Sequence, residues 1–202
     1  MKDKSIGILV VLTVVATLIG GILATVYHAA APKIEANRLA EEKRAIFEVL
    51  PDAERYETIE AILPGDKGDE LVKIFKGFDG EGRFVGYAYT VAGPGFQAVI
   101  TMMVGLRPDY IRLHGMQVLE QLETPGLGNK ILYDDFRDQF KGLELVPKIE
   151  YVKNKKPEKP NEIRAVAGAT ITSKSVVNII NEDSKRVIEY LKGHEGYAPT
   201  GE

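Results

Sequence analysis

The feature that most constrains this chain is an uncharged apolar run near its start, from Ile6 to Tyr27. These 22 residues, at roughly 1.5 Å each, make a helix of about 33 Å, against a bilayer hydrocarbon core of about 30 Å. The run therefore predicts a transmembrane helix. A cleaved signal peptide is the alternative, but its apolar core is usually only about 7–15 residues long. We expect a retained anchor with a soluble domain after it.

The charges beside this run bear on its orientation. Two lysines, Lys2 and Lys4, precede it, and four basic residues follow within the next turns: Lys33, Arg38, Lys43 and Arg44. The loop rule for positive charge weakens when a whole folded domain follows the span, and the charge closest to the membrane is N-terminal. We expect residues 1–5 to be cytoplasmic and the domain to be extracytoplasmic. The Gly20–Gly21 pair is compatible with close packing against neighbouring membrane helices.

The rest of the chain has the pattern of an α+β domain. Residues 28–51 predict a juxtamembrane helix, with Pro32 near its first turn and Pro51 as its stop. From Leu71 onward, β-rich runs separated by Gly, Pro and Asp predict an antiparallel sheet. We expect the domain to occupy residues 52–193, with residues 194–202 as a tail.

The second half of this domain predicts helices that flank the sheet. A glycine-rich loop and a helical patch cover residues 123–140, and residues 152–162 form a polar connection. A last amphipathic helix starts near Thr172. Its apolar face contains Val176, Val177, Ile180, Val187, Ile188 and Leu191.

Composition removes several classes of function. The chain has no cysteine, so it contains no disulfide, no thiolate metal site and no cysteine nucleophile. Its three histidines, in unrelated contexts, have neither metal-ligand spacing nor the pattern of a catalytic triad, so we predict no metal site and no catalytic residue. A net charge of −3 argues against a nucleic-acid partner. Any redox role must rest on another cofactor.

Two glycine motifs are the candidate binding sites. The first is ETPGLG at residues 123–128, where glycines allow close approach of a flat ligand and Glu123 and Thr124 supply polar groups. The second is AGATITS at residues 167–173, where the amides of the following helix start can hold an anion beside Lys174. From the residues alone, the first motif is also compatible with a plain turn. The second is compatible with a helix cap made by Thr170, Thr172 or Ser173.

Three motifs in this order resemble one family. They are PKIEANRLAEEKRAI after the single span, ETPGLG, and AGATITS before an amphipathic helix. The chain resembles the membrane-anchored flavoproteins of the FMN-binding-domain family, which includes the G subunit of Rnf ion-translocating electron-transport complexes. The C subunit of the sodium-pumping NADH:quinone oxidoreductase is a more distant member. The resemblance implies FMN joined by a phosphoester to Thr170, attached by a magnesium-dependent flavin transferase that uses FAD. The family motif has Asp six residues before this Thr, where this chain has Arg164, with Glu162 nearby.

The resemblance also implies roles for both motifs and for the whole chain. Phosphate contacts fall to Thr172, Ser173 and Lys174, with Gly168 and Ala169 allowing close approach; Glu123, Thr124, Gly126 and Leu127 are candidates for the wall of the isoalloxazine ring. The chain would be a subunit of a redox-driven ion-translocating complex of the ferredoxin:NAD oxidoreductase type, with other subunits and membrane lipid as partners. Two alternatives are an unflavinylated assembly subunit and an anchored sensor that binds a small ligand reversibly.

Overall fold

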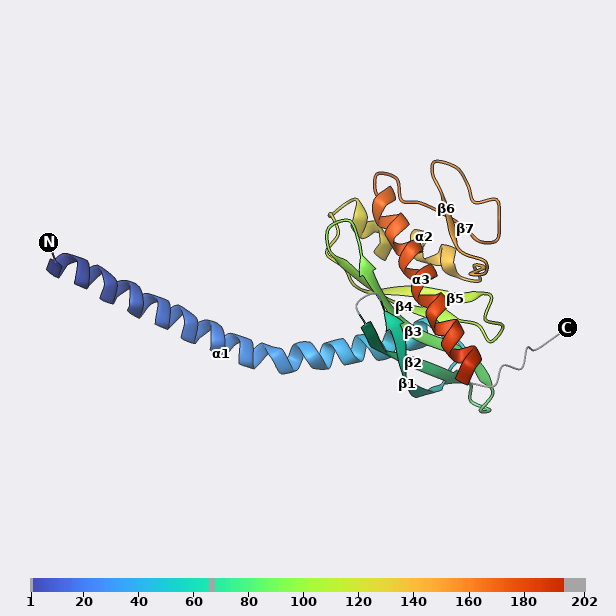
Figure 1. The fold of residues 1–202 in the computed structure, drawn as a ribbon, viewed down its shortest axis with the longest axis horizontal. Helices are drawn as coiled ribbons and strands as arrows, with labels where there is room; N and C mark the ends of the chain where they lie inside the picture. Colours follow the sequence, from blue (N-terminus) through green and yellow to red (C-terminus); the bar gives the residue numbers. More distant parts are fainter. Residues whose placement is uncertain (1, 66–67, 195–202) are drawn as a thin grey trace. The chain divides into compact units, whose positions relative to one another are not determined.

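A computed structural model describes residues 2–65 and 68–194 of the chain (Figure 1). The chain divides into two compact units, Met1–Glu41 and Glu42–Glu202. The predicted tail at 194–202 lies outside the described residues except for His194, as does Met1 of the predicted N-terminal segment.

Helix α1 (Lys2–Val49) is continuous and contains Pro32 in its interior. The sequence predicted a separate helix beginning near Pro32, whereas the structure continues one helix through it. Proline removes one backbone donor, the bond that would reach the carbonyl of His28, while the turns on either side keep theirs. Among the described residues, α1 is the helix long and apolar enough to cross a membrane, judged by length and composition.

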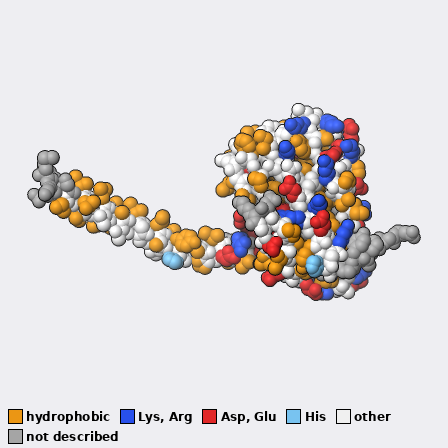
Figure 2. Space-filling view, in the orientation of Figure 1, with side chains coloured by type: hydrophobic (Ala, Val, Ile, Leu, Met, Phe, Trp, Pro, Cys, Tyr) orange, Lys and Arg blue, Asp and Glu red, His pale blue; other side chains and the backbone are white. Residues whose placement is uncertain are grey.

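The apolar part of α1 satisfies its own polar side chains. Thr13, Thr17 and Thr25 each donate a hydroxyl hydrogen bond to the carbonyl four residues earlier, at 2.9, 2.8 and 2.8 Å. Hydrophobic side chains cover much of the helix, as Figure 2 shows. A hydroxyl bonded within its own helix needs no external partner, which suits a segment surrounded by lipid.

The second unit is built on a five-stranded antiparallel sheet with strand order β1-β2-β3-β4-β5. The predicted antiparallel sheet and the α+β class are therefore confirmed. The sequence did not predict the first strand, because its charged residues Arg55, Glu57 and Glu60 do not alternate regularly with apolar ones. The strands are β1 (Arg55–Gly65), β2 (Gly68–Phe78), β3 (Phe84–Pro94), β4 (Val99–Leu106) and β5 (Leu113–Glu120).

The two faces of the sheet bury different partners. On β3, Tyr87, Tyr89 and Val91 belong to the larger core, whereas Ala88 between them belongs to a smaller one. Because side chains alternate along a strand, these residues face opposite sides of the sheet. The larger core includes the buried face of α3 (Thr170–His194). The smaller one is completed by the end of α1, through Ala45, Ile46 and Val49, and by Leu50, which follows the helix.

Helix α3 crosses the sheet with the apolar face that the sequence predicted (Figure 1). It begins at Thr170, two residues before the predicted start. A buried polar contact joins it to β3, where the Tyr89 hydroxyl donates to Ser184 Oγ at 2.7 Å. Burial is the main cause that raises the pKa of Tyr89, so its hydroxyl stays protonated. The six predicted positions of the apolar face, Val176, Val177, Ile180, Val187, Ile188 and Leu191, are all buried.

Short elements connect the sheet to α3. The predicted helical patch is present as η1 (Gly128–Leu132), α2 (Asp134–Arg137) and η2 (Asp138–Phe140). The predicted polar connection lies between β6 (Glu150–Val152) and β7 (Glu162–Arg164). These two strands form a small parallel sheet, which the sequence did not predict because each has only three residues.

The packing of α1 against β4 gives a test of the smaller core. A Cβ at Gly105 would lie 2.1 Å from the Val49 carbonyl oxygen, whereas a Cβ at the paired Gly115 would meet only Lys141 Cγ at 3.6 Å. We predict that Gly105→Ala lowers the free energy of unfolding by about 1–3 kcal/mol, because backbone must move. Denaturation of the purified chain in detergent measures this. Gly115→Ala is the matched control, and equal effects of the two changes would contradict the prediction.

Candidate functional site

The fold brings the two glycine motifs into contact. The Thr172 hydroxyl donates to Glu123 Oε2 at 2.6 Å, across 49 positions of sequence. A Cβ added at Gly168 would lie 3.0 Å from Leu127 Cδ2, so this glycine lies directly against the first motif. Residues that the sequence could only place in two separate loops therefore form one site at the start of α3.

The Glu123 carboxylate is the centre of this contact. It is 4% exposed, and its Oε1 accepts backbone N–H bonds from Phe96 at 2.9 Å and from Gln97 at 3.0 Å. Burial alone would raise the pKa of this carboxyl, but the hydrogen bonds from Thr172, Gln97, Phe96 and Ala98 outweigh burial and lower it. Glu123 is therefore an ionised buried group that holds the β3–β4 loop, its own loop and the start of α3 together.

Two glycines allow the chain to close around this carboxylate. A Cβ at Gly95 would lie 2.4 Å from Glu123 Oε1, and a Cβ at Gly128 would lie 2.8 Å from Glu123 Oε2. No other residue type fits at either position without displacing the carboxylate. The glycines of ETPGLG and of the β3–β4 loop thus serve close packing as well as turning.

The hydroxyls at the start of α3 have different surroundings. Thr172 is committed to Glu123, and Ser173 Oγ accepts from the Val166 N–H and donates to the Ala169 carbonyl, both at 3.0 Å. Neither one makes the helix cap that the sequence left open. The Thr170 hydroxyl is partly exposed and makes no hydrogen bond within the described part of the chain.

The backbone around Thr170 is open to a ligand. Gly168 has φ +79°, a left-handed conformation that favours glycine, and the Ala169 N–H bonds the Val166 carbonyl at 3.0 Å to close the turn. The first intrahelical bond is donated by Ser173 to Ala169. The N–H groups of residues 170–172 precede it and have no acceptor within the helix. They are suited to an anion.

This region matches a known domain. Residues 95–183 match the FMN-binding domain, a range that starts at Gly95 and includes both glycine motifs. Relatives extend the similarity over nearly the whole chain. It is 29% identical over 189 residues, 94% of its length and 95% of the relative's, to the G subunit of an ion-translocating oxidoreductase complex from Methanosarcina acetivorans. The chain belongs to the FMN-binding-domain family.

Further comparisons support this assignment. The chain is 34% identical over 141 residues, 69% of its length and 66% of the relative's, to the G subunit of the Na⁺-translocating ferredoxin:NAD⁺ oxidoreductase complex of Acetobacterium woodii. Its fold is similar to crystal structures of the C subunit of the Na⁺-translocating NADH-quinone reductase from Parabacteroides distasonis (TM-score 0.60, 17% identity, 79% of this chain and 96% of that one) and of NqrC from Shewanella oneidensis (TM-score 0.61, 22% identity, 75% of each chain).

In this FMN-binding domain, the ETPGLG loop is held by its own backbone. The Thr124 carbonyl accepts from Leu127 N–H at 3.1 Å and Asn129 N–H at 3.3 Å, and Gly126 N–H donates to Asn129 Oδ1 at 2.8 Å. Gly126 has φ +75°. The Thr124 hydroxyl bonds Gln97 Oε1 at 3.3 Å, so the loop has little freedom.

The predicted site residues have different surroundings in the structure. Thr170, Gly168 and Ala169 line the turn, and Leu127 and Gly126 are exposed beside it. Glu123, Thr172 and Ser173 are buried and bonded within the protein, and their contacts with FMN stay a prediction. Lys174 is exposed one turn into the helix. Glu162, near Arg164, accepts the Glu158 N–H at 2.9 Å and is tied to its own loop.

The sequence analysis did not single out the β3–β4 loop. Its Phe96 is 61% exposed although its backbone N–H is bonded to Glu123. Ile171, next to Thr170, is 58% exposed, and Leu127 is 44% exposed. Large apolar side chains that stay exposed around a rigid polar centre indicate a ligand or partner surface. The Gly-Pro-Gly run at residues 93–95 was the available signal for a tight approach here.

The buried carboxylate predicts a specific dependence on pH. The pKa of Glu123 is lowered below its ordinary 4.5. Its stabilising contribution is therefore fully present above that value and is lost as pH falls through the lower folded pKa. We predict that Glu123→Gln reduces the free energy of unfolding by about 1–3 kcal/mol at pH 6–8, and that its difference from wild type shrinks in acid.

Denaturant unfolding at a series of pH values, on wild type and Glu123→Gln in parallel, measures this difference. Glu120→Gln, an exposed change three residues away, is the control and should leave stability unchanged over the same range. A wild-type to Glu123→Gln difference that is independent of pH down to full protonation would contradict the prediction.

Proposed function

We propose that this chain carries FMN joined through its phosphate to Thr170 Oγ1 and relays electrons in a membrane-bound, redox-driven ion-translocating complex of the ferredoxin:NAD oxidoreductase type. The attachment to Thr170 is supported by a comparison of the hydroxyl groups at the start of α3. Thr172 and Ser173 have protein partners, whereas Thr170 has none among the described residues. Thr170 is the hydroxyl that is left to react.

The residues around Thr170 fit a phosphate. The N–H groups of residues 170–172 have no acceptor within the helix, and the helix dipole favours negative charge at this end of α3. Gly168 is exposed and has no side chain, and exposed Lys174 adds a cation within one turn. Thr172 and Ser173 act indirectly, because they hold the turn in place through Glu123 and Val166.

The same site offers a surface for the isoalloxazine ring. Leu127 lies against Gly168 and is exposed. Phe96, whose backbone is bonded to Glu123, and Ile171, which follows Thr170, are exposed as well. Gly126 presents bare backbone, since no atom lies within 4 Å of its Cβ position. A bound flavin accepts electrons in pairs or singly, so it connects two-electron donors to one-electron centres. The protein's part is to hold and orient the ring.

The long apolar helix α1 and relatives named as subunits of ion-translocating complexes identify the chain as a membrane protein. We place its domain outside the cytoplasm on a single span, in contact with lipid and with the other subunits of the complex. A covalent bond suits that location, because a carrier without one would lose FMN to dilution. Attachment there requires a magnesium-dependent flavin transferase with FAD as the donor. The pyrophosphate bond of FAD would break, the FMN phosphate would join Thr170 Oγ1, and AMP and the hydroxyl proton would leave.

Attachment predicts a loss with one substitution. Thr170→Ala, co-expressed with the transferase, should fold and show no covalent flavin, whereas wild type should gain the mass of FMN minus water. Intact-protein mass and in-gel flavin fluorescence after SDS denaturation measure both. Ser175→Ala, one turn further along α3, is the matched control and should be fully modified.

Each alternative gives a different result in the same experiment. Covalent flavin on Thr170→Ala would show that Thr170 is the wrong residue. A colourless wild-type chain from its native membrane would favour an assembly subunit. Flavin that denaturation releases would favour reversible binding.

The ring surface predicts an effect of Gly126 on the flavin. Gly126→Val places a branched side chain in the open space beside the loop and strains a residue at φ +75°. We predict a changed flavin absorption spectrum and midpoint potential, or lower flavinylation, with Thr170 intact. Gly82→Val is the control, because Gly82 has φ +81° in an exposed turn between other strands. A fully flavinylated Gly126→Val chain with unchanged spectrum and potential would contradict the prediction.

A further inference from the structure

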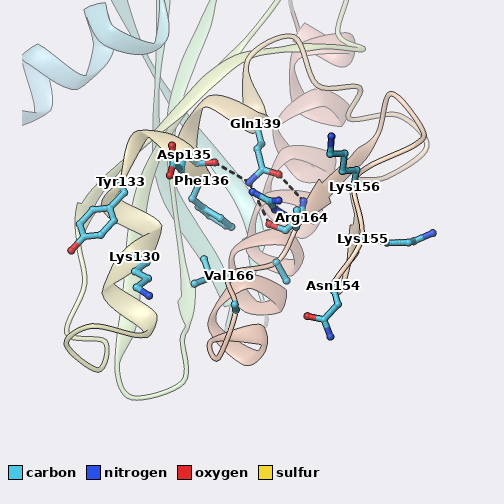
Figure 3. Close-up of a pocket in the computed structure, with 12 residues that line it drawn as sticks. Lys130, Tyr133, Asp135, Phe136, Gln139, Asn154, Lys155, Lys156, Arg164 and Val166 are labelled. Atoms are coloured by element: carbon cyan, nitrogen blue, oxygen red, sulfur yellow. Dashed lines mark hydrogen bonds between the residues drawn. The ribbon is translucent and has the colours of Figure 1, made fainter.

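A pocket lies beside the segment that leads to Thr170. Its volume is about 450 Å³. Figure 3 shows Lys130, Tyr133 and Phe136 on one side, Asn154–Lys156 on the other, and Arg164 between them. The segment 165–167, which leads to Gly168 and Thr170, completes the lining. None of the residues assigned above to FMN lines this pocket.

The pocket carries an excess of positive charge. Four of its lining residues are cationic, Lys130, Lys155, Lys156 and Arg164, and one, Asp135, is acidic. The side chains of the four cations form no hydrogen bond or ion pair with other described residues. By contrast, Arg83, Arg112, Arg137 and Arg186 all have carboxylate partners. In a chain with net charge −3, unpaired cations gathered around one cavity point to an anionic ligand.

The floor of the pocket is fixed before any ligand arrives. The Arg164 N–H donates to Gln139 Oε1 at 2.7 Å, and Gln139 Nε2 donates to the Arg164 carbonyl at 3.3 Å. Both the oxygen and the nitrogen of the Gln139 amide bond the Arg164 main chain. The main chain of Arg164 is therefore held in place, and its guanidinium has no partner among the described residues. Phe136 is 3% exposed and packs edge-on against Phe140, with ring centroids 5.4 Å apart.

An aromatic ring lies beside the cations. Tyr133 lines the pocket and is 54% exposed, so its ring is available for stacking. The guanidinium of Arg164 can bind a phosphate through two parallel hydrogen bonds, and the lysines add point charges. We propose that this pocket binds a nucleotide, with its phosphates on Arg164 and the lysines and its base on Tyr133. The combination of an aromatic face and unpaired cations in one preformed cavity favours this ligand over a protein surface, which needs no concavity.

The test measures binding of ADP by isothermal titration calorimetry to the full chain in detergent. We expect one saturable site, with ADP at least about tenfold tighter than either pyrophosphate or adenosine. Arg164→Gln should weaken ADP about tenfold, the effect of losing a charge-assisted hydrogen-bond pair. Lys130→Gln is a second variant on the opposite wall and should also weaken it. Lys185→Gln, exposed on α3 and outside the pocket, removes the same charge and should have no effect.

Two preparations separate this proposal from flavin attachment. The affinity for ADP should be the same for Thr170→Ala and for the chain that carries covalent flavin, with the modification state checked by intact mass. Loss of ADP binding on flavinylation would overturn the proposal, because the flavin itself would then fill the pocket.

Three other results would also overturn it. Equal affinity for ADP and pyrophosphate would leave an anion site without base recognition. Binding of a polyglutamate peptide, sensitive to Arg164→Gln, without binding of ADP would assign the surface to an acidic protein partner. Absence of ADP binding to wild type would remove the site.

Discussion

The site depends on one buried charge, the ionised carboxylate of Glu123. Its two oxygens reach two backbone amides of the β3–β4 loop and the Thr172 hydroxyl at the start of α3. A buried carboxylate is tolerated only when such donors surround it, so each partner also fixes the position of the others. Three segments that are distant in sequence therefore meet at one point, and the turn containing Thr170 is placed by a group that does not itself need to touch a cofactor.

The sheet supplies the frame for that arrangement. Strands β3 and β4 bury residues on both of their faces, so the loop between them starts and ends on closely packed strands. Helix α3 packs on one of these faces through a continuous apolar stripe. The close approach of α1 to Gly105 on the opposite face leaves no room for relaxation there. The binding surface consists of loops and a helix start, while the layers beneath it are closely packed, an arrangement common for sites on α+β folds.

Sequence patterns predicted the elements with strong periodicity. The apolar stripe of α3 and the β-rich runs after Leu71 each follow a short periodic pattern of apolar residues. Such a pattern can be recognised from neighbouring positions in the sequence alone. Strand β1 was missed because its exposed glutamates weaken the alternation. The hydrogen bonds of Glu123 could not be predicted, because its partners lie 26, 27 and 49 residues away in the sequence; its contact with the isoalloxazine ring stays a prediction. For the loop that contains Phe96, the Gly-Pro-Gly run at residues 93–95 signals a tight turn but does not indicate which segment approaches it.

The buried bond from Tyr89 to Ser184 has a geometric consequence for the far end of α3. An apolar stripe alone allows a helix to roll or slide by small amounts, since one methyl group replaces another at little cost. A hydroxyl pair with a fixed length does not, because any roll would strand two polar atoms in the core. Ser184 lies 14 residues after Thr170, about 21 Å along the axis. Because the bond fixes the rotation of α3 about its own axis, it also fixes the side of the helix on which Thr170 lies. One internal contact therefore also fixes the direction in which the Thr170 side chain points.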